Sequence, residues 1–151
     1  MNAESLETRA LRYLARREHS RLELAQKLAT DTQSSASEAL SSLLDKLEQK
    51  GFLSEQRFVE QLVKTRRPKF GCQRIIYELK QKGIDEQLIA NVLPELKETE
   101  FDAAYEVWRR KFGTLPINVK ERGKQMRFMM SRGFSSEVIG QALLHAEQEE
   151  A

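Results

Sequence analysis

The sequence predicts an all-α protein, arranged as three tandem three-helix repeats in an elongated or curved array. Composition is the first reason: Leu, Glu, Ala and Gln supply 62 of the 151 residues, whereas the β-branched Val, Ile and Thr supply 18. The second reason is an apolar pattern of helical period that recurs along the chain. The third is a basic stretch followed by an acidic stretch, three times over. No apolar run is long enough to cross a membrane, so we expect no membrane partner.

Three amphipathic segments predict the first helix of each repeat. They are LETRALRYLARR, QRFVEQLVKTR and EFDAAYEVWRRK, at 6–17, 56–66 and 100–111. Proline-bearing turns at 66–68 and 113–116 follow the second and third of these segments.

The second helices are bounded by capping residues. They begin at Ser20, where SRLE forms a capping box, near Gly71 and near Asn118. Gly83 and Gly133 end two of them, because glycine tolerates the left-handed backbone conformation of a helix C-cap.

The third helices carry the repeated apolar pattern. After Gly83 and Gly133, apolar pairs recur five and six, then nine and ten, residues further on, which is one face of an α-helix. A weaker copy has Ser34 at the position of the glycine. The predicted repeats are therefore 1–50, 51–97 and 98–151.

The net charge of +2 hides strong segregation of opposite charges. Basic stretches at 9–27, 64–82 and 109–132 carry net charges of +4, +6 and +7. The acidic stretches that follow them, at 31–49, 85–106 and 133–151, carry −3, −6 and −4. Such basic stretches fit an acidic partner surface or a nucleic acid backbone. Alternatively, they pair with the acidic third helices of the protein itself.

Twelve cations are the candidate partner-binding residues, because Arg and Lys bind carboxylates and phosphates. They are Arg9, Arg12, Arg16, Lys64, Arg66, Arg67, Lys69, Arg74, Lys120, Arg122, Lys124 and Arg127. The stripe formed by the first three is also typical of an ordinary solvated helix face.

Other distinctive residues fit structural roles. We assign Tyr105, Trp108 and the methionines of 126–130 to packing. Cys72 lies near a helix start, where its pKa could fall, but no second cysteine completes a redox pair, so we expect it to be inert. His19 and His145 have no ligand cluster at metal spacing, so no metal or other cofactor is expected.

The sequence contains no catalytic motif of the GxxxxGK[ST], HExxH or GxSxG type, so we expect a protein that is not an enzyme. A metal-dependent nuclease built on an unrecognised acid pair remains the alternative. The single cysteine and the lack of an apolar leader fit a cytoplasmic protein, and we expect a monomer.

Four segments in a fixed order closely resemble the RecX family of bacterial recombination regulators. They are ALRYLARREHSRLELAQKL, LLDKLEQKGFLSEQRFVEQLVKTR, GCQRIIYELKQKGIDEQLI and RFMMSRGFSSEVIGQAL. The resemblance implies a protein that lodges in the helical groove of the RecA nucleoprotein filament. There it would inhibit the recombinase, ATPase and coprotease activities and so modulate homologous recombination, DNA repair and the SOS response.

A second interpretation is a helical-repeat protein that binds single- or double-stranded DNA directly and without sequence specificity. Loss of binding between low and moderate salt would distinguish it from a protein that docks on another protein. Nonspecific DNA contact also fits the first interpretation as an auxiliary interaction.

Overall fold

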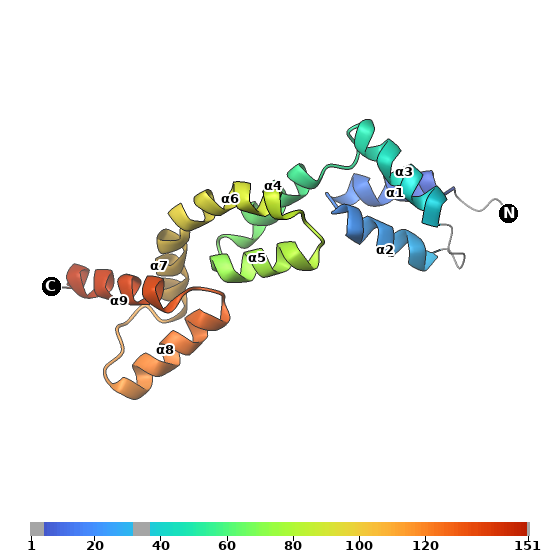
Figure 1. Cartoon of the computed structure of the whole chain (residues 1–151). Coiled ribbons are helices and arrows are strands. Elements are labelled where there is room, and N and C mark those ends of the chain that lie inside the picture. The colour runs from blue at the N-terminus through green and yellow to red at the C-terminus, as the bar shows by residue number, and fades with distance from the viewer. Residues whose placement is uncertain (1–4, 32–36, 151) are drawn as a thin grey trace. The chain divides into compact units, whose positions relative to one another are not determined.

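A computed structural model describes residues 5–31 and 37–150, and these residues form nine α-helices without a β-strand (Figure 1). The helices are α1 (Leu6–Arg16), α2 (Arg21–Asp31), α3 (Ser37–Gln49), α4 (Glu55–Arg66), α5 (Cys72–Gln81), α6 (Glu86–Glu98), α7 (Glu100–Lys111), α8 (Val119–Ser131) and α9 (Ser136–Glu150). The all-α class and the three successive groups of three helices are confirmed. Ser34, assigned the place of a glycine, lies outside the described residues.

The chain divides into two compact units. The first comprises Met1–Leu62 with Lys80–Asp85, and the second comprises Val63–Leu79 with Glu86–Ala151. Helices α4 and α5 therefore each contribute residues to both units.

The first unit has a core of aliphatic side chains from α1, α2, α3 and the turn after α3. Its buried members are Ala10, Leu24, Leu28, Leu44, Leu47 and Leu53. They recur at three- and four-residue spacing within their helices, so each helix turns one apolar face inwards.

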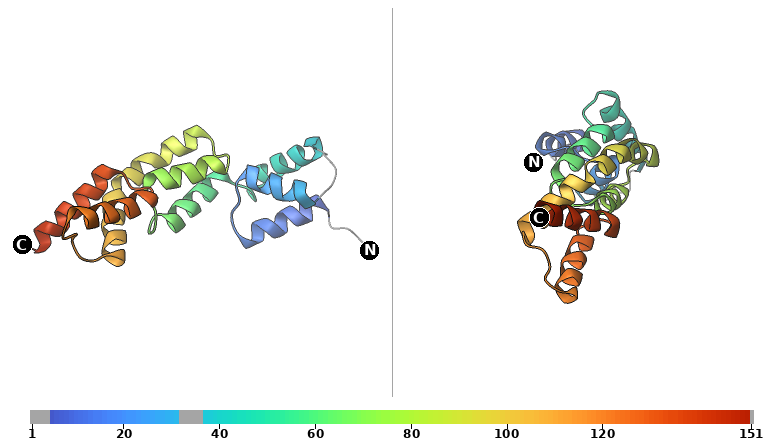
Figure 2. Two further views of the ribbon diagram at one scale, coloured as in Figure 1. Left: turned by 90° about the horizontal axis from the view of Figure 1, so that it is seen from below. Right: turned by 90° about the vertical axis from the view of Figure 1, so that its left-hand side faces the viewer.

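The core of the third repeat lies in the second unit, where α7 packs against both α8 and α9 (Figure 2). Trp108 is buried there, as predicted, and its indole N–H donates a hydrogen bond of 2.8 Å to Oε1 of buried Gln125. The Gln125 amide then donates to the Thr114 carbonyl at 3.1 Å. Two polar groups that burial would otherwise leave unsatisfied are thereby paired.

The predicted helix starts are confirmed by their capping bonds. Ser20 Oγ accepts from the Glu23 N–H at 3.1 Å, and Asn118 Oδ1 accepts from the Glu121 N–H at 2.8 Å. Ser135 Oγ caps α9 in the same way.

The predicted helix ends are confirmed at the two glycines, since Gly83 and Gly133 have φ angles of 74° and 94°.

Two packing expectations need qualification. Met129 is fully buried, but Met130, which lies 100° further round α8, is about half exposed. Cys72 is buried at the first residue of α5, and burial raises the pKa of its thiol despite the helix start. A protonated, covered thiol fits the inert role expected for it.

Candidate partner-binding surfaces

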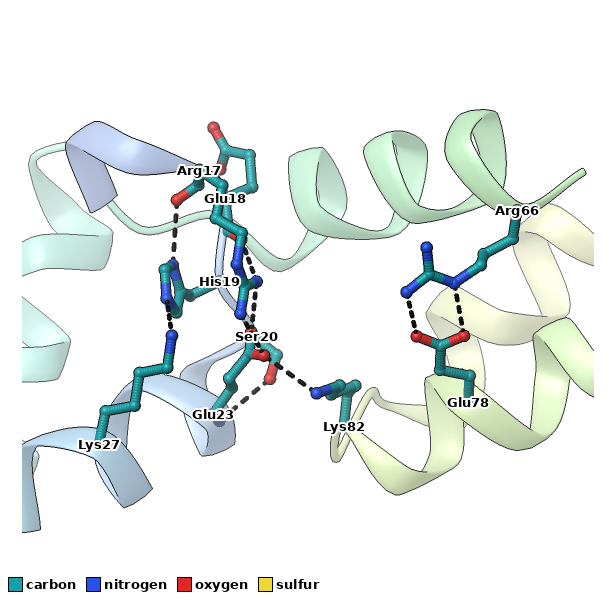
Figure 3. Close-up of polar contacts among 9 residues, drawn as sticks. All are labelled: Arg17, Glu18, His19, Ser20, Glu23, Lys27, Arg66, Glu78 and Lys82. Carbon is teal, nitrogen blue, oxygen red and sulfur yellow. Dashed lines mark hydrogen bonds and ion pairs between the residues drawn. The ribbon is translucent and has the colours of Figure 1, made fainter. Parts of the chain in front are cut away.

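The predicted cluster of cations at the α4–α5 turn is split by the fold. Arg66 forms a forked ion pair with Glu78 of α5, with Nε–Oε1 and Nη2–Oε2 distances of 2.8 and 2.9 Å (Figure 3). The pair raises the pKa of Arg66 and holds the end of α4 against α5. The acid lies on the second helix of its own repeat, not on an acidic third helix.

The guanidinium of Arg67 forms hydrogen bonds inside the second unit. Its guanidinium donates to the Leu96 carbonyl at 2.9 Å and to the Phe70 carbonyl at 3.2 Å. Burial lowers its pKa, while the charge of Glu100 opposes that effect. Arg67 thus ties the turn before α5 to the end of α6, and Lys64, Lys69 and Arg74 are the cluster members left exposed.

Arg74 belongs to a chain of cation–aromatic contacts on the second unit, which we call the Arg–Phe strip: Lys111, Phe128, Arg132, Phe70 and Arg74. The Arg74 guanidinium lies 4.6 Å from the centre of the Phe70 ring, and that of Arg132 lies 5.5 Å from the same centre. Arg132 also lies 5.1 Å from the centre of the Phe128 ring, and Lys111 Nζ lies 5.0 Å from it. Three cations are thereby held in fixed positions by two aromatic rings.

Backbone bonds between two loops build the strip. The Gly71 N–H donates to the Arg132 carbonyl at 2.7 Å, and the Gln73 N–H donates to the Gly133 carbonyl at 3.2 Å. These bonds place the residue before Gly71, which is Phe70, beside the residue before Gly133, which is Arg132. The ion pairs of the described residues include no carboxylate bound to a strip cation. The strip therefore presents three positive charges that an anionic ligand can reach.

The four candidate cations of α8 are all exposed, but they do not form one stripe. At 100° per residue, Lys120, Lys124 and Arg127 share a face of the helix. Arg122 lies on the side that carries the buried Gln125 and Met129 one and two turns later. The strip and the three aligned cations are both on the second unit.

In the first unit, Arg12 and Arg16 are exposed and Arg9 is partly covered. The other cations of the same basic stretch stabilise the unit. Arg21 Nη1 bonds to both Asp45 and Glu48 of α3 at 2.8 Å, and these bonds raise the pKa of Arg21.

Glu23 is the centre of a buried charge cluster in the first unit (Figure 3). Its carboxylate accepts two hydrogen bonds from Arg17, at 3.0 and 2.7 Å, and one from Lys82 at 3.0 Å. Burial opposes ionisation of Glu23, but these two cations outweigh that effect and lower its pKa to about 2. The capping box predicted at Ser20 therefore has one of its two hydrogen bonds, from the Glu23 N–H to Ser20 Oγ, while the Glu23 side chain binds the two cations instead.

His19 is a packed residue of the same unit. Burial lowers its pKa, so the ring is neutral. Its Nδ1–H donates to the Arg17 carbonyl at 3.0 Å, and Nε2 accepts from Lys27 Nζ at 2.8 Å. Across residues 5–31 and 37–150 no group of three metal-ligating side chains occurs, and none of the helices there has the length and apolarity to span a membrane.

The sequence had indicated Arg74 but not three of its partners in the strip, namely Lys111, Phe128 and Arg132. Lys111 and Arg132 lie within the basic stretch 109–132, so charge was a usable signal. Their placement beside Phe70 depends on a contact between two distant loops, which local patterns do not specify.

Comparisons with known proteins agree over nearly the whole chain. Residues 98–143 match the third three-helix domain of RecX, and residues 54–93 match the second. The regulatory protein RecX of Leptothrix cholodnii is 47% identical, over 96% of this chain and 91% of its own. That of Herminiimonas arsenicoxydans is also 47% identical, over 96% and 94%. The crystal structure of RecX from Lactobacillus salivarius has the same fold, with a TM-score of 0.77, 17% identity and 95% coverage of each chain.

Proposed function

The chain belongs to the RecX family of regulatory proteins, and we propose that it binds the RecA nucleoprotein filament in its helical groove and inhibits strand exchange, ATP hydrolysis and coprotease activity. By this route it modulates homologous recombination, DNA repair and the SOS response. It acts in the cytoplasm as a monomer and needs no cofactor.

The Arg–Phe strip is the observation that carries the proposal. A RecA filament offers acidic side chains and the phosphates of its DNA, and guanidinium groups bind both in a forked geometry. Stacking on Phe70 and Phe128 fixes the two arginines before binding, so less side-chain entropy is lost on contact. The exposed cations of α1 and α8 then supply further weak contacts.

Several weak contacts suffice when they lie on one chain. We propose that the repeats at 1–50, 51–97 and 98–151 contact successive features of the filament. Each bound repeat raises the local concentration of the next, so the overall affinity exceeds that of any single repeat. Occupation of the groove excludes homologous DNA and coprotease substrates without any catalytic step.

The test replaces the strip cations Lys111, Arg74 and Arg132 together by Gln. Loss of three contacts, each worth about 0.5–1 kcal/mol, weakens filament binding by about tenfold or more. Inhibition of strand exchange and ATP hydrolysis falls in parallel. The matched control replaces Lys97, Arg109 and Arg110 by Gln, which removes the same charge from the same unit but lies outside the strip. Equal loss in both variants would show that only net charge matters.

Direct nonspecific DNA binding is the second candidate, favoured by the net charge of +7 over 109–132. For a protein that neutralises six to ten phosphates, raising the salt concentration from 50 to 200 mM lowers the affinity for DNA by about 10³–10⁵. Binding to DNA alone and to the filament is therefore measured at both salt concentrations. Filament binding that persists where DNA binding is lost supports the regulator, and equal losses support the DNA-binding protein.

Blocking and disassembly of the filament differ in their linkage to nucleotide state. A protein that favours an inactive filament binds the ADP and ATP-analogue forms with different affinities. Equal affinity for both forms leaves steric blockage of the groove as the mechanism.

A further inference from the structure

The second unit contains a close joint between the second and third repeats. The first turn of α5 packs on the glycine turn that follows α8, through the bonds from Gly71 and Gln73 described above. A side-chain carbon on Gly133 would lie 2.5 Å from Cβ of Arg74. The joint therefore requires a glycine in the receiving turn.

The first unit contains an equivalent joint. Here the first turn of α2 packs on the glycine turn that follows α5, which belongs to the next repeat. A side-chain carbon on Gly83 would lie 2.8 Å from Cδ2 of Leu22, and Lys82 pairs with Glu23. In both joints the start of a second helix is received by the glycine turn of the following repeat.

The corresponding helix start of the third repeat is exposed. The residues on either side of Asn118 are Ile117 and Val119, which are 85% and 87% exposed. The corresponding pairs are His19 and Arg21 at the α2 start and Phe70 and Cys72 at the α5 start. His19 and Cys72 are 1% and 7% exposed, and the other two are partly buried. Two β-branched apolar side chains thus project from the start of α8.

Two hydrogen bonds close this turn. Asn118 accepts from the Glu121 N–H, and the Glu121 carboxylate accepts from the Ile117 N–H at 3.1 Å. These bonds hold the turn, which has an apolar tip, with Lys120 and Lys124 on one face of α8 and Arg122 on the other.

We propose that the first turn of α8 docks its Ile117 and Val119 side chains into an apolar recess with an acidic rim on a protomer of the recombinase. The proposal rests on the proposed function. Two neighbouring exposed aliphatic side chains fit an apolar recess of a protein surface, and the measurement on DNA alone tests the alternative that they wedge between bases. The flanking cations require the acidic rim. In a second copy of this chain the glycine turns at Gly83 and Gly133 already receive helix starts, and the sedimentation measurement below tests the rest of its surface.

The test compares two double variants of the full chain. Ile117→Ser with Val119→Ser removes the apolar tip, while Met130→Ser with Leu144→Ser removes two other exposed apolar side chains of the same unit. Both variants are first compared with the parent by thermal unfolding. Binding is then measured to RecA filaments on single-stranded DNA with a slowly hydrolysed ATP analogue, and separately to the DNA alone.

We expect the Ile117/Val119 variant to bind filaments at least tenfold more weakly, which corresponds to 1.4 kcal/mol. Its binding to DNA alone and its thermal unfolding stay unchanged, and the Met130/Leu144 control binds within threefold of the parent. Unchanged filament binding by the Ile117/Val119 variant overturns the inference while the proposed function stands. A parent protein that fails to bind filaments refutes the proposed function itself. If the parent is a dimer in sedimentation and the Ile117/Val119 variant is a monomer, the partner of this turn is a second copy of the chain and the inference is overturned.

Discussion

Replacement of Glu23 by Gln tests the charge cluster that stabilises the first unit. The carboxylate has a pKa of about 2, against an ordinary value of 4.5. This difference corresponds to about 3 kcal/mol of stabilisation at neutral pH. Arg17 and Lys82 are partly exposed, so solvent screening reduces the expected loss to about 2 kcal/mol.

The folded and ordinary pKa values of Glu23 determine how the stability of the protein depends on pH. A carboxyl group whose pKa is lowered by folding stabilises the protein fully above its unfolded pKa, and the effect is lost as pH falls towards the folded pKa. With values of 4.5 and about 2, about two fifths of the stabilisation remains at pH 3. The stability difference between the parent and Glu23→Gln therefore shrinks from pH 7 to pH 3 and disappears below pH 2.

Hydrogen exchange followed by mass spectrometry is the appropriate assay, because it reports on each unit separately. At pH 7, Glu23→Gln increases exchange in peptides from α1 and α2, while peptides from α8 and α9 serve as the internal control. Urea unfolding followed by circular dichroism supplies the free energy at each pH. A stability difference that stays constant between pH 7 and pH 3 would refute the assigned pKa and the role of the cluster.

Two further predictions concern the second unit. Gly133→Ala destabilises the protein by more than about 2 kcal/mol in urea unfolding, because the added carbon meets Arg74 and the φ of Gly133 is 94°. Gly140→Ala is the control: its added carbon has no atom within 4 Å, and it stabilises α9 by about 0.5–1 kcal/mol. Gln125→Leu lowers stability by about 1–3 kcal/mol, since the Trp108 indole N–H loses its buried acceptor, and the emission spectrum of Trp108 shifts; an unchanged midpoint would show that this hydrogen bond has no net effect.

Helix starts were predictable from the sequence because capping is a local interaction. Ser20, Asn118 and Ser135 each accept a bond from the backbone three residues ahead, so a short segment contains both partners. The glycine C-caps are equally local. Burial of Trp108 followed from its position on an apolar helix face.

The roles of individual cations were less predictable. Arg66 and Arg74 belong to one basic stretch, yet Arg66 pairs with Glu78 and Arg74 stacks on Phe70. The choice depends on which helix faces meet, and charge density along the sequence contains no such information. Arg67 illustrates the same limit, because its acceptor is the carbonyl of Leu96, a group that every residue carries.

The two inter-repeat joints show how one geometry serves two electrostatic purposes. The third residue after the helix cap and the residue before the receiving glycine are Glu23 and Lys82 in the first joint. Their charges are opposite, so they pair and stabilise the joint. In the second joint the same positions hold Arg74 and Arg132, and both stack on Phe70. Like charges held close together repel, and the backbone bonds and the aromatic ring must offset that repulsion. A bound carboxylate or phosphate would remove this repulsion, so an anionic partner on the strip stabilises the joint as well as the complex. The affinity for such a partner and the rigidity of the second unit should therefore rise and fall together.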